Sequence, residues 1–234
     1  ISPSCDKTSD QSKIETTTAS DSIAQNQTQE MKMLAYAFQN DYKSLWKQVD
    51  SLQNIGLYKS ALEVVDVIYG TARSENNAPQ VVKAVIHKMK YNSYMTEDDM
   101  VVALNELNSI SNTSTFPLKQ IVHSITADAY WGYYQSNRWK FLNRTQTVNF
   151  ENEDVRTWDL NKIIQHVNMH YMLSLANKDS LQHTNTQDFN EILVAYKEDN
   201  IQRPSLFDFL AHRALDYFEN TESALVRPED KFIA

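Results

Sequence analysis

Apolar residues recur at helical spacing along most of this chain, and the clearest example follows Gly56. The apolar positions there fall every three or four residues, on one face of a helix: Ala61, Val64, Val65, Ile68, Tyr69 and Ala72. A stripe with this period predicts an amphipathic α-helix that packs its apolar face against a neighbour. A shorter stripe precedes it, formed by Leu45, Val49 and Leu52 with Trp46 beside them. We therefore expect two helices joined by a turn at Gly56.

Further stripes with the same period continue toward the C-terminal end of the chain. Three lie between positions 82 and 129: Val82, Val85, Ile86 and Met89; Met100, Ala103, Leu104, Leu107 and Ile110; and Leu118, Ile121, Val122, Ile125 and Ala129. Two more lie farther along: Leu160, Ile163, Ile164, Val167, Tyr171 and Leu175; and Leu206, Phe209, Leu210, Ala214 and Phe218. Pro117 suits a first helical position, and Ser205 suits an N-cap. The aperiodic stretch 138–158 is predicted to be a long ordered connection.

The turn residues favour an all-α fold, an irregular array of antiparallel helical hairpins. The 234 residues include only three glycines and five prolines, fewer than the turns of a large antiparallel sheet require. The segment NIGLYKSAL (54–62) is similar to the mid-repeat turn of a tetratricopeptide unit. Ala103–Leu104 occupies the position in the next hairpin that is equivalent to Ala61–Leu62. The spacing between the two pairs exceeds the roughly 34 residues of a tetratricopeptide repeat, and the second hairpin lacks the Gly and the aromatic residue of the first. The array is therefore predicted to be tetratricopeptide-like but irregular, as a superhelix or a bundle.

The distribution of apolar residues also divides the chain into three parts. Residues 1–28 are rich in Ser, Thr, Asp and Gln and are predicted to form a flexible tether, because they cannot bury enough apolar surface to offset the entropy of ordering. Residues 29–220 form the predicted helical-hairpin domain. Residues 221–234 are polar and are predicted to be an exit linker toward a possible downstream domain.

The single cysteine, Cys5, follows small residues in the sequence ISPSC. One cysteine excludes an internal disulfide and a four-cysteine metal site. A Cys in this context, followed by a polar tether, resembles the lipidated residue of a bacterial lipoprotein. The alternative is a free cysteine in a flexible tail. Lipidation would place the protein in the cell envelope, in the periplasm or at the outer membrane, attached to the membrane only through Cys5.

The overall charge narrows the classes of partner. The formal net charge is −8, which argues against nucleic acid as a partner because phosphates require a basic surface. The sequence contains no run of about 18 apolar residues, so it predicts no membrane-spanning helix.

The sequence HVNMH offers the nearest approach to a metal motif. His166 and His170 lie one helical turn apart and could share a zinc ion, but the Glu of the HExxH protease motif is replaced by Val167. No third ligand can be assigned, so these are weak candidates and ordinary interfacial histidines are the preferred interpretation. No nucleophile elbow, Walker loop or dinucleotide-binding pattern occurs. We expect no enzymatic activity, no metal and no cofactor.

Aromatic residues and arginines alternate between positions 130 and 158. Trp, Tyr and Arg are frequent in binding hot spots, so Trp131, Tyr134, Arg138 and Trp139 are predicted as a possible partner-binding surface. The alternative is that these aromatic rings pack the connection onto the helices.

Four blocks together resemble the N-terminal helical region of large bacterial alpha-2-macroglobulin family lipoproteins. They are YKSLWKQVDSLQNIGLYKSALEVVDVIYGTARSENNAPQVVKAVIHKMKY, ADAYWGYYQSNRWKFLNRT, VRTWDLNKI and RPSLFDFLAHRALDYF. The resemblance spans about Tyr42 to Phe218. It implies an envelope protein that traps or inhibits proteases, with macroglobulin β-domains beyond residue 234. The thioester motif of many members is absent from these residues, so no functional residue is carried over.

The resemblance implies that the chain is a non-enzymatic interaction or spacer module of such a protease-trapping protein. The alternative is a free-standing tetratricopeptide-like lipoprotein that binds a peptide or protein partner. A protein partner is expected in both cases.

Overall fold

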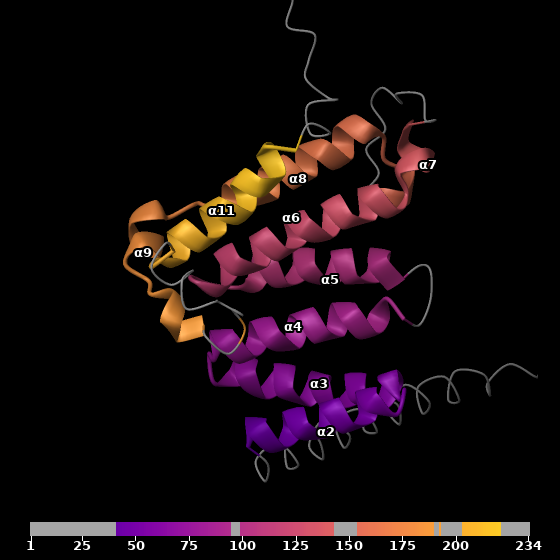
Figure 1. Cartoon of the computed structure of the whole chain (residues 1–234), viewed down its shortest axis with the longest axis vertical. Coiled ribbons are helices and arrows are strands. Elements are labelled where there is room, and N and C mark those ends of the chain that lie inside the picture. Colours follow the sequence, from indigo (N-terminus) through magenta and orange to yellow (C-terminus); the bar gives the residue numbers. More distant parts are fainter. Residues whose placement is uncertain (1–40, 95–98, 143–153, 190–191, 193–202, 221–234) are drawn as a thin grey trace, which may run out of the picture.

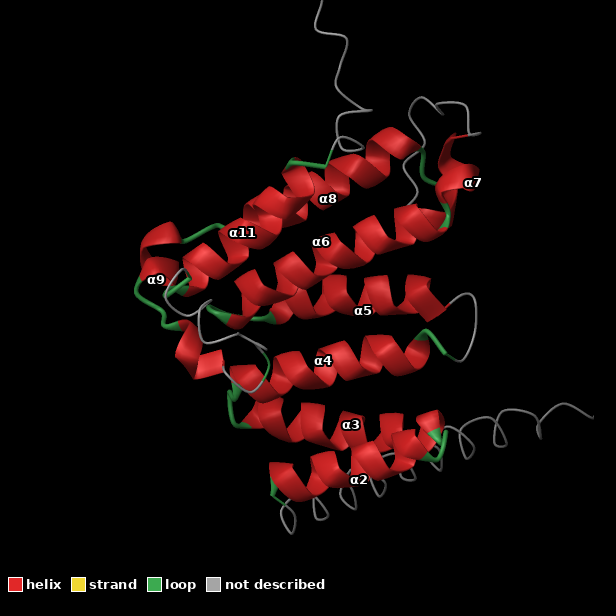
Figure 2. Ribbon diagram, viewed as in Figure 1, coloured by secondary structure: helices red, strands yellow, loops and turns green. Residues whose placement is uncertain are grey.

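The computed structural model describes residues 41–94, 99–142, 154–189, 192 and 203–220. The helices are α2 (Tyr42–Asn54), α3 (Tyr58–Ser74), α4 (Ala78–Asn92), α5 (Asp99–Thr113), α6 (Leu118–Ser136), α7 (Arg138–Leu142), η1 (Val155–Thr157), α8 (Leu160–Ser174), α9 (Lys178–Gln182), η2 (Thr186–Phe189) and α11 (Leu206–Phe218). Helices and loops make up the described part of the chain (Figure 2). Within these residues, β pairing is limited to one isolated antiparallel bridge between Asn185 and Ser205. The predicted all-α fold class is confirmed.

The helices pack mainly in chain order. Helix α2 packs on α3, α3 on α4, α4 on α5, α5 on α6 and α6 on α8, and Figure 1 shows α3 to α6 side by side in this order. The connections 55–57 and 75–77 are short, so the packed neighbours on either side run antiparallel. Helix α11 departs from this order because it returns to α6 and also contacts α8 and α9. A tetratricopeptide-like arrangement stays a prediction.

The turn predicted at Gly56 separates α2 from α3. Gly56 has φ 77°, in the left-handed region that glycine adopts without steric cost. The Leu57 N–H donates to the Leu52 carbonyl at 2.9 Å, and the Gly56 N–H donates to the Gln53 carbonyl at 3.0 Å. These bonds satisfy carbonyls at the end of α2 and reverse the chain.

Side-chain caps define the starts of several helices. Ser205 caps α11 in a reciprocal capping box with Asp208, as the sequence predicts for Ser205. Asn77 and Asp159 accept backbone N–H groups at the starts of α4 and α8. Pro117 was predicted to be the first residue of its helix, but α6 begins at Leu118 with Pro117 just before it. The discrepancy is one residue, within the usual uncertainty of a helix end.

The buried apolar side chains form two clusters. The smaller cluster joins α2 and α3 to one face of α4, and its members are Leu45, Trp46, Val49, Ala61, Val64, Val65, Ile68, Ala84 and Tyr91. The larger cluster extends from the end of α3 to α11 and surrounds α6, where Val122, Ala127 and Tyr134 are fully buried. Helix α6 therefore lies at the centre of the larger part of the core.

Several sequence predictions lie outside the described residues. These are the tether 1–28 with Cys5, the exit linker 221–234 and most of the predicted connection 138–158. The described parts of that connection contain α7 and η1.

Candidate functional site

Helix α6 borders a groove that is lined almost entirely by apolar side chains. We call it the apolar groove; its volume is about 430 Å³. Its walls come from α4, the start of α5, α6, η2 and α11: Val82, Ile86, Met89, Met100, Ile121, Ser124, Ile125, Asp128, Ala129, Gly132, Phe189, Ile192, Leu206, Phe209, Leu210 and Arg213. Its size is in the range of small-molecule pockets, about 300–1,000 Å³.

Three polar residues form one corner of the apolar groove. Arg213 of α11 donates from Nε to the Ser124 hydroxyl of α6 at 2.9 Å, and its Nη2 forms an ion pair with the Asp128 carboxylate. The Tyr171 hydroxyl of α8 donates to Asp128 Oδ1. Burial raises the pKa of Tyr171 to about 12, so this hydroxyl keeps its proton and remains a donor. Burial also lowers the pKa of Arg213, but the guanidinium keeps its charge at neutral pH. The corner thus joins α6, α8 and α11 through one ion pair, and the nearby Asp216 of α11 also favours the charged form of Arg213.

Gly132 lies on the wall that α6 contributes to the apolar groove. A Cβ atom built on Gly132 would meet nothing within 4 Å. The residue sits inside a helix of 19 residues, where glycine costs about 1 kcal/mol relative to alanine. The backbone of α6 is therefore accessible at this point of the groove.

The second groove, which we call the polar groove, is lined by α5, α6, η1 and α8. It measures about 1110 Å³ and is lined by Val101, Asn105, Asn108, Ser111, Asn112, His123, Tyr130, Asp154, Arg156, Trp158, Lys162, His166, Met169, His170 and Leu173. Most of these side chains carry hydrogen-bonding groups. Tyr130 accepts a hydrogen bond from Asn108 Nδ2 at 2.7 Å, which fixes α5 to α6 at this wall.

Two buried histidines lie at the base of the polar groove. His123 Nδ1 and His170 Nδ1 are 3.0 Å apart, and the side chains are only 4% and 3% exposed. Burial lowers the pKa of His123 to about 4, with a smaller lowering from Lys119. Burial also lowers the pKa of His170 to about 4, with smaller contributions from His123 and His166. Both rings are therefore neutral at pH 7, and one N–H donates to the other nitrogen.

Further aromatic rings pack around the histidine pair, and two of them, Trp158 and Tyr130, are also buried. His166 packs on Trp158 with ring centroids 4.1 Å apart, and Trp158 stacks on Tyr130 at 5.5 Å. His170 packs on Tyr130 at 5.6 Å. This packing of His166 and His170 against aromatic rings is consistent with their interpretation as interfacial histidines.

The structure brings no third metal ligand to His166 and His170 among the described residues. His170 directs Nδ1 at His123, and His166 packs on Trp158. Within the described ranges, no group of three or more His, Cys, Asp or Glu side chains could hold a metal ion.

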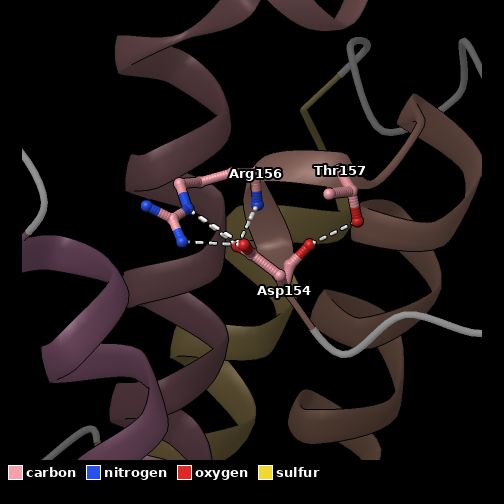
Figure 3. Close-up of polar contacts among 3 residues, drawn as sticks. All are labelled: Asp154, Arg156 and Thr157. Atoms are coloured by element: carbon pink, nitrogen blue, oxygen red, sulfur yellow. Dashed lines mark hydrogen bonds and ion pairs between the residues drawn. The ribbon is translucent and has the colours of Figure 1, made fainter.

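A short turn at η1, in which Asp154 pairs with Arg156, borders the polar groove. The Asp154 carboxylate accepts from Arg156 Nε at 3.0 Å, from Arg156 Nη2 at 2.8 Å and from the Arg156 backbone N–H at 3.0 Å (Figure 3). The Thr157 hydroxyl donates to the Asp154 carbonyl at 2.7 Å. The Arg156 side chain, followed by its backbone N–H, holds the pKa of Asp154 below its usual value. These bonds connect Asp154 to the backbone and side chains of η1 at the edge of the groove.

The predicted partner-binding residues separate into a buried and an exposed pair. Tyr134 is fully buried, and Trp131 is half-buried with its ring edge-on to Tyr217 of α11 at 5.1 Å. Tyr134 therefore cannot contact a partner, and the prediction is wrong for this residue. Tyr134 lies on the face of α6 that packs into the core. The alternation of aromatic residues and arginines in the sequence does not show which face a residue lies on. Arg138 and Trp139 of α7 are exposed, and Trp139 is 65% exposed.

The sequence interpretation did not identify the polar corner or the partner of His170. Asp128 and Arg213 lie in different helices and far apart in sequence, as do His123 and His170. The available signal was local: His123, Ser124 and Asp128 are polar residues inside an apolar helical pattern, and Gly132 is a glycine within it.

Comparison with known proteins yields no match to a family model, a curated protein or a solved structure. In the portion of the chain that the structure describes, no helix has the length and apolar character needed to cross a membrane.

Proposed function

We propose that this chain is a non-enzymatic helical interaction or spacer module of a cell-envelope, alpha-2-macroglobulin-like protease-trapping protein. The observation that carries the proposal is the packing of helices in chain order, each mainly against its neighbours. Such arrays form long, continuous surfaces suited to holding other domains or partners. Lipidation at Cys5 attaches the module to the membrane, and downstream macroglobulin domains extend from its C-terminal side.

The exposed pair Arg138 and Trp139 is the proposed contact point. Both residues lie on the short helix α7, next to the end of α6 (Figure 1). A Trp side chain that is 65% exposed leaves a large apolar surface in water, and Trp and Arg contribute strongly to binding when a partner covers them. Lys140 Nζ lies 5.4 Å from the Trp139 ring centroid, so a cation lies beside the exposed ring. We propose that an acidic or aromatic surface of the partner covers this pair.

The second candidate is a free-standing tetratricopeptide-like lipoprotein that binds a peptide or protein. The exposed pair Arg138 and Trp139 fits this candidate equally well, because either a separate partner chain or another domain of the same chain could cover Trp139.

Site-specific photocrosslinking in cells separates the two candidates. A benzophenone amino acid at Trp139 in the full-length protein should give one discrete adduct, and the same group at exposed Ile55 serves as the control. A crosslink within the same polypeptide supports the macroglobulin module, whereas a crosslink to another protein supports the second candidate. Absence of a discrete adduct at position 139, or equal adducts at both positions, contradicts both.

The lipid anchor is tested separately. The full gene product should incorporate radiolabelled palmitate and fractionate with membranes, and Cys5→Ala should lose both properties. Equal labelling of the Cys5→Ala variant would exclude this residue as the anchor.

A further inference from the structure

The apolar groove has the dimensions of a site for a small molecule rather than for a protein. Its volume of about 430 Å³ lies within the range of small-molecule pockets, about 300–1,000 Å³. A stable protein interface covers about 800 Å² of each partner, more than a groove of this size offers. An extended peptide would also bury an N–H and a C=O at each residue, and the groove has only one polar corner for them. The occupant therefore has one polar group and an apolar body.

The charge balance of the corner decides which polar group fits. Asp128 neutralises Arg213 through their ion pair, and its Oδ1 also accepts the Tyr171 hydroxyl. A charged head would find Arg213 and Asp128 already paired with each other, so it would have to compete with their ion pair for a counter-charge. Nη1 of Arg213 has no hydrogen-bond partner among the described residues, although Nε and Nη2 have theirs. An uncharged acceptor such as an ester or amide carbonyl suits these remaining N–H groups.

The shape of the groove fixes where the apolar body lies. The α6 wall runs from Ile121 to Gly132, about three helical turns or about 16 Å. At Gly132 the space above the helix is open, since an added Cβ would meet nothing within 4 Å. Met89 of α4 and Met100 of α5 complete this part of the groove, and methionine side chains adapt to occupants of different shape.

We propose that the apolar groove binds a neutral amphiphile, with its acyl chain over Gly132 and an uncharged carbonyl of its head at Arg213. A monoacylglycerol or an N-acyl amide has this chemistry. The site is independent of the exposed pair Arg138 and Trp139, so it goes beyond the protein contact proposed above.

Calorimetric titration of the full chain tests the proposal with three amphiphiles that share a ten-carbon chain. These are 1-decanoylglycerol, decanoate and decyltrimethylammonium, each below its critical micelle concentration. The neutral compound should bind in the micromolar range, and both charged compounds at least tenfold more weakly. Equal affinity for all three, or no binding of 1-decanoylglycerol, overturns the proposal.

Gly132→Leu tests the location, because its side chain would fill the open space. This variant should weaken 1-decanoylglycerol binding at least tenfold while its thermal midpoint equals or exceeds that of the wild type. Gly70→Leu is the matched control: Gly70 is also inside a helix, with nothing within 4 Å of an added Cβ, but it does not line the groove. Equal affinities of the two variants would overturn the assignment.

A second variant changes a residue of α4, on another wall of the groove. Ile86→Trp starts from a side chain that is already 44% exposed, so it should fold and should also weaken binding. Unchanged binding in Ile86→Trp and Gly132→Leu together excludes the groove. Tighter binding of an acetylated and amidated apolar peptide than of 1-decanoylglycerol would assign the groove to a polypeptide and refute the proposal.

Discussion

The apolar groove and the polar groove border the same helix, α6, but their polar groups differ in charge and in burial. In the apolar groove the polar groups are half-buried, charged and paired, as Arg213 and Asp128 show. In the polar groove they are neutral, as His123 and His170 show. A charged pair is stable while both partners remain, whereas a neutral imidazole pair depends on the pH of the solution. The apolar groove should therefore respond to loss of a partner, and the polar groove to acid.

The largest expected effect is acid destabilisation through His123 and His170. An unfolded imidazole has a pKa near 6.5, whereas both folded groups have pKa values of about 4. Between these values the unfolded state binds more protons, so stability falls as the pH falls through this window. Lowering the pH from 7 to 5 should reduce the free energy of unfolding by about 3 kcal/mol, measured by urea denaturation.

The matched control for this effect is His123→Asn/His170→Asn. The two amides can keep one hydrogen bond but do not titrate, so the dependence on pH between 7 and 5 should largely disappear. A double variant that remains as sensitive to acid as the wild type would show that other groups are responsible.

The next largest effect is expected from Arg213→Met. This change removes the guanidinium and leaves Asp128 with only the Tyr171 hydroxyl. Because both charged side chains are partly exposed, the free energy of unfolding should fall by about 1.5 kcal/mol. Asp128→Asn in the same chain removes the uncompensated charge and keeps an oxygen for Tyr171. The double variant should recover about half of the loss, measured by chemical denaturation, and a strictly additive loss would contradict the proposed pairing.

A smaller effect is expected at the wall of the polar groove. Tyr130→Phe removes the hydroxyl that accepts from Asn108 but keeps the ring stacked on Trp158. The expected loss is about 1 kcal/mol in the free energy of unfolding. In a double-mutant cycle with Asn108→Ala, the double variant should lose little more than the larger single loss.

The smallest effect has the opposite sign and concerns Gly132. Gly132→Ala should raise the free energy of unfolding by about 0.8 kcal/mol, because the helix gains propensity and the added Cβ meets no atom. Gly56→Ala should instead destabilise by about 1 kcal/mol, because φ is 77° there. Thermal unfolding of the two variants compares them directly, and a shift of the same sign in both would contradict this account.

The helices could be predicted from the sequence because their determinants are local. The stripe from Ala61 to Ala72 specifies the buried face of α3, and Ala61, Val65, Ile68 and Ala72 are fully buried. Ser205 specifies the start of α11 through a bond to the backbone three residues later. Such signals lie within one or two helical turns, where sequence spacing determines proximity.

The candidate site could not be predicted in the same way because tertiary packing creates it. Arg213 meets Ser124 across 89 positions of sequence, and His123 meets His170 across 47. Tyr134 and Trp139 belong to one aromatic run, yet one is fully buried and the other is largely exposed. Which face of α6 becomes internal depends on where α8 and α11 pack, and residue types alone do not specify this.

The return of α11 to α6 has a consequence for the order in which the chain assembles. Packing between helices adjacent in sequence closes short loops, whereas docking of α11 on α6 must close a long one. We expect α2 to α6 to associate early during synthesis and α11 to dock late. Until then, Ile121, Ile125 and Ala129 lack the opposite wall of the apolar groove. The time between these two events is when this protein is most open to chaperone capture or self-association.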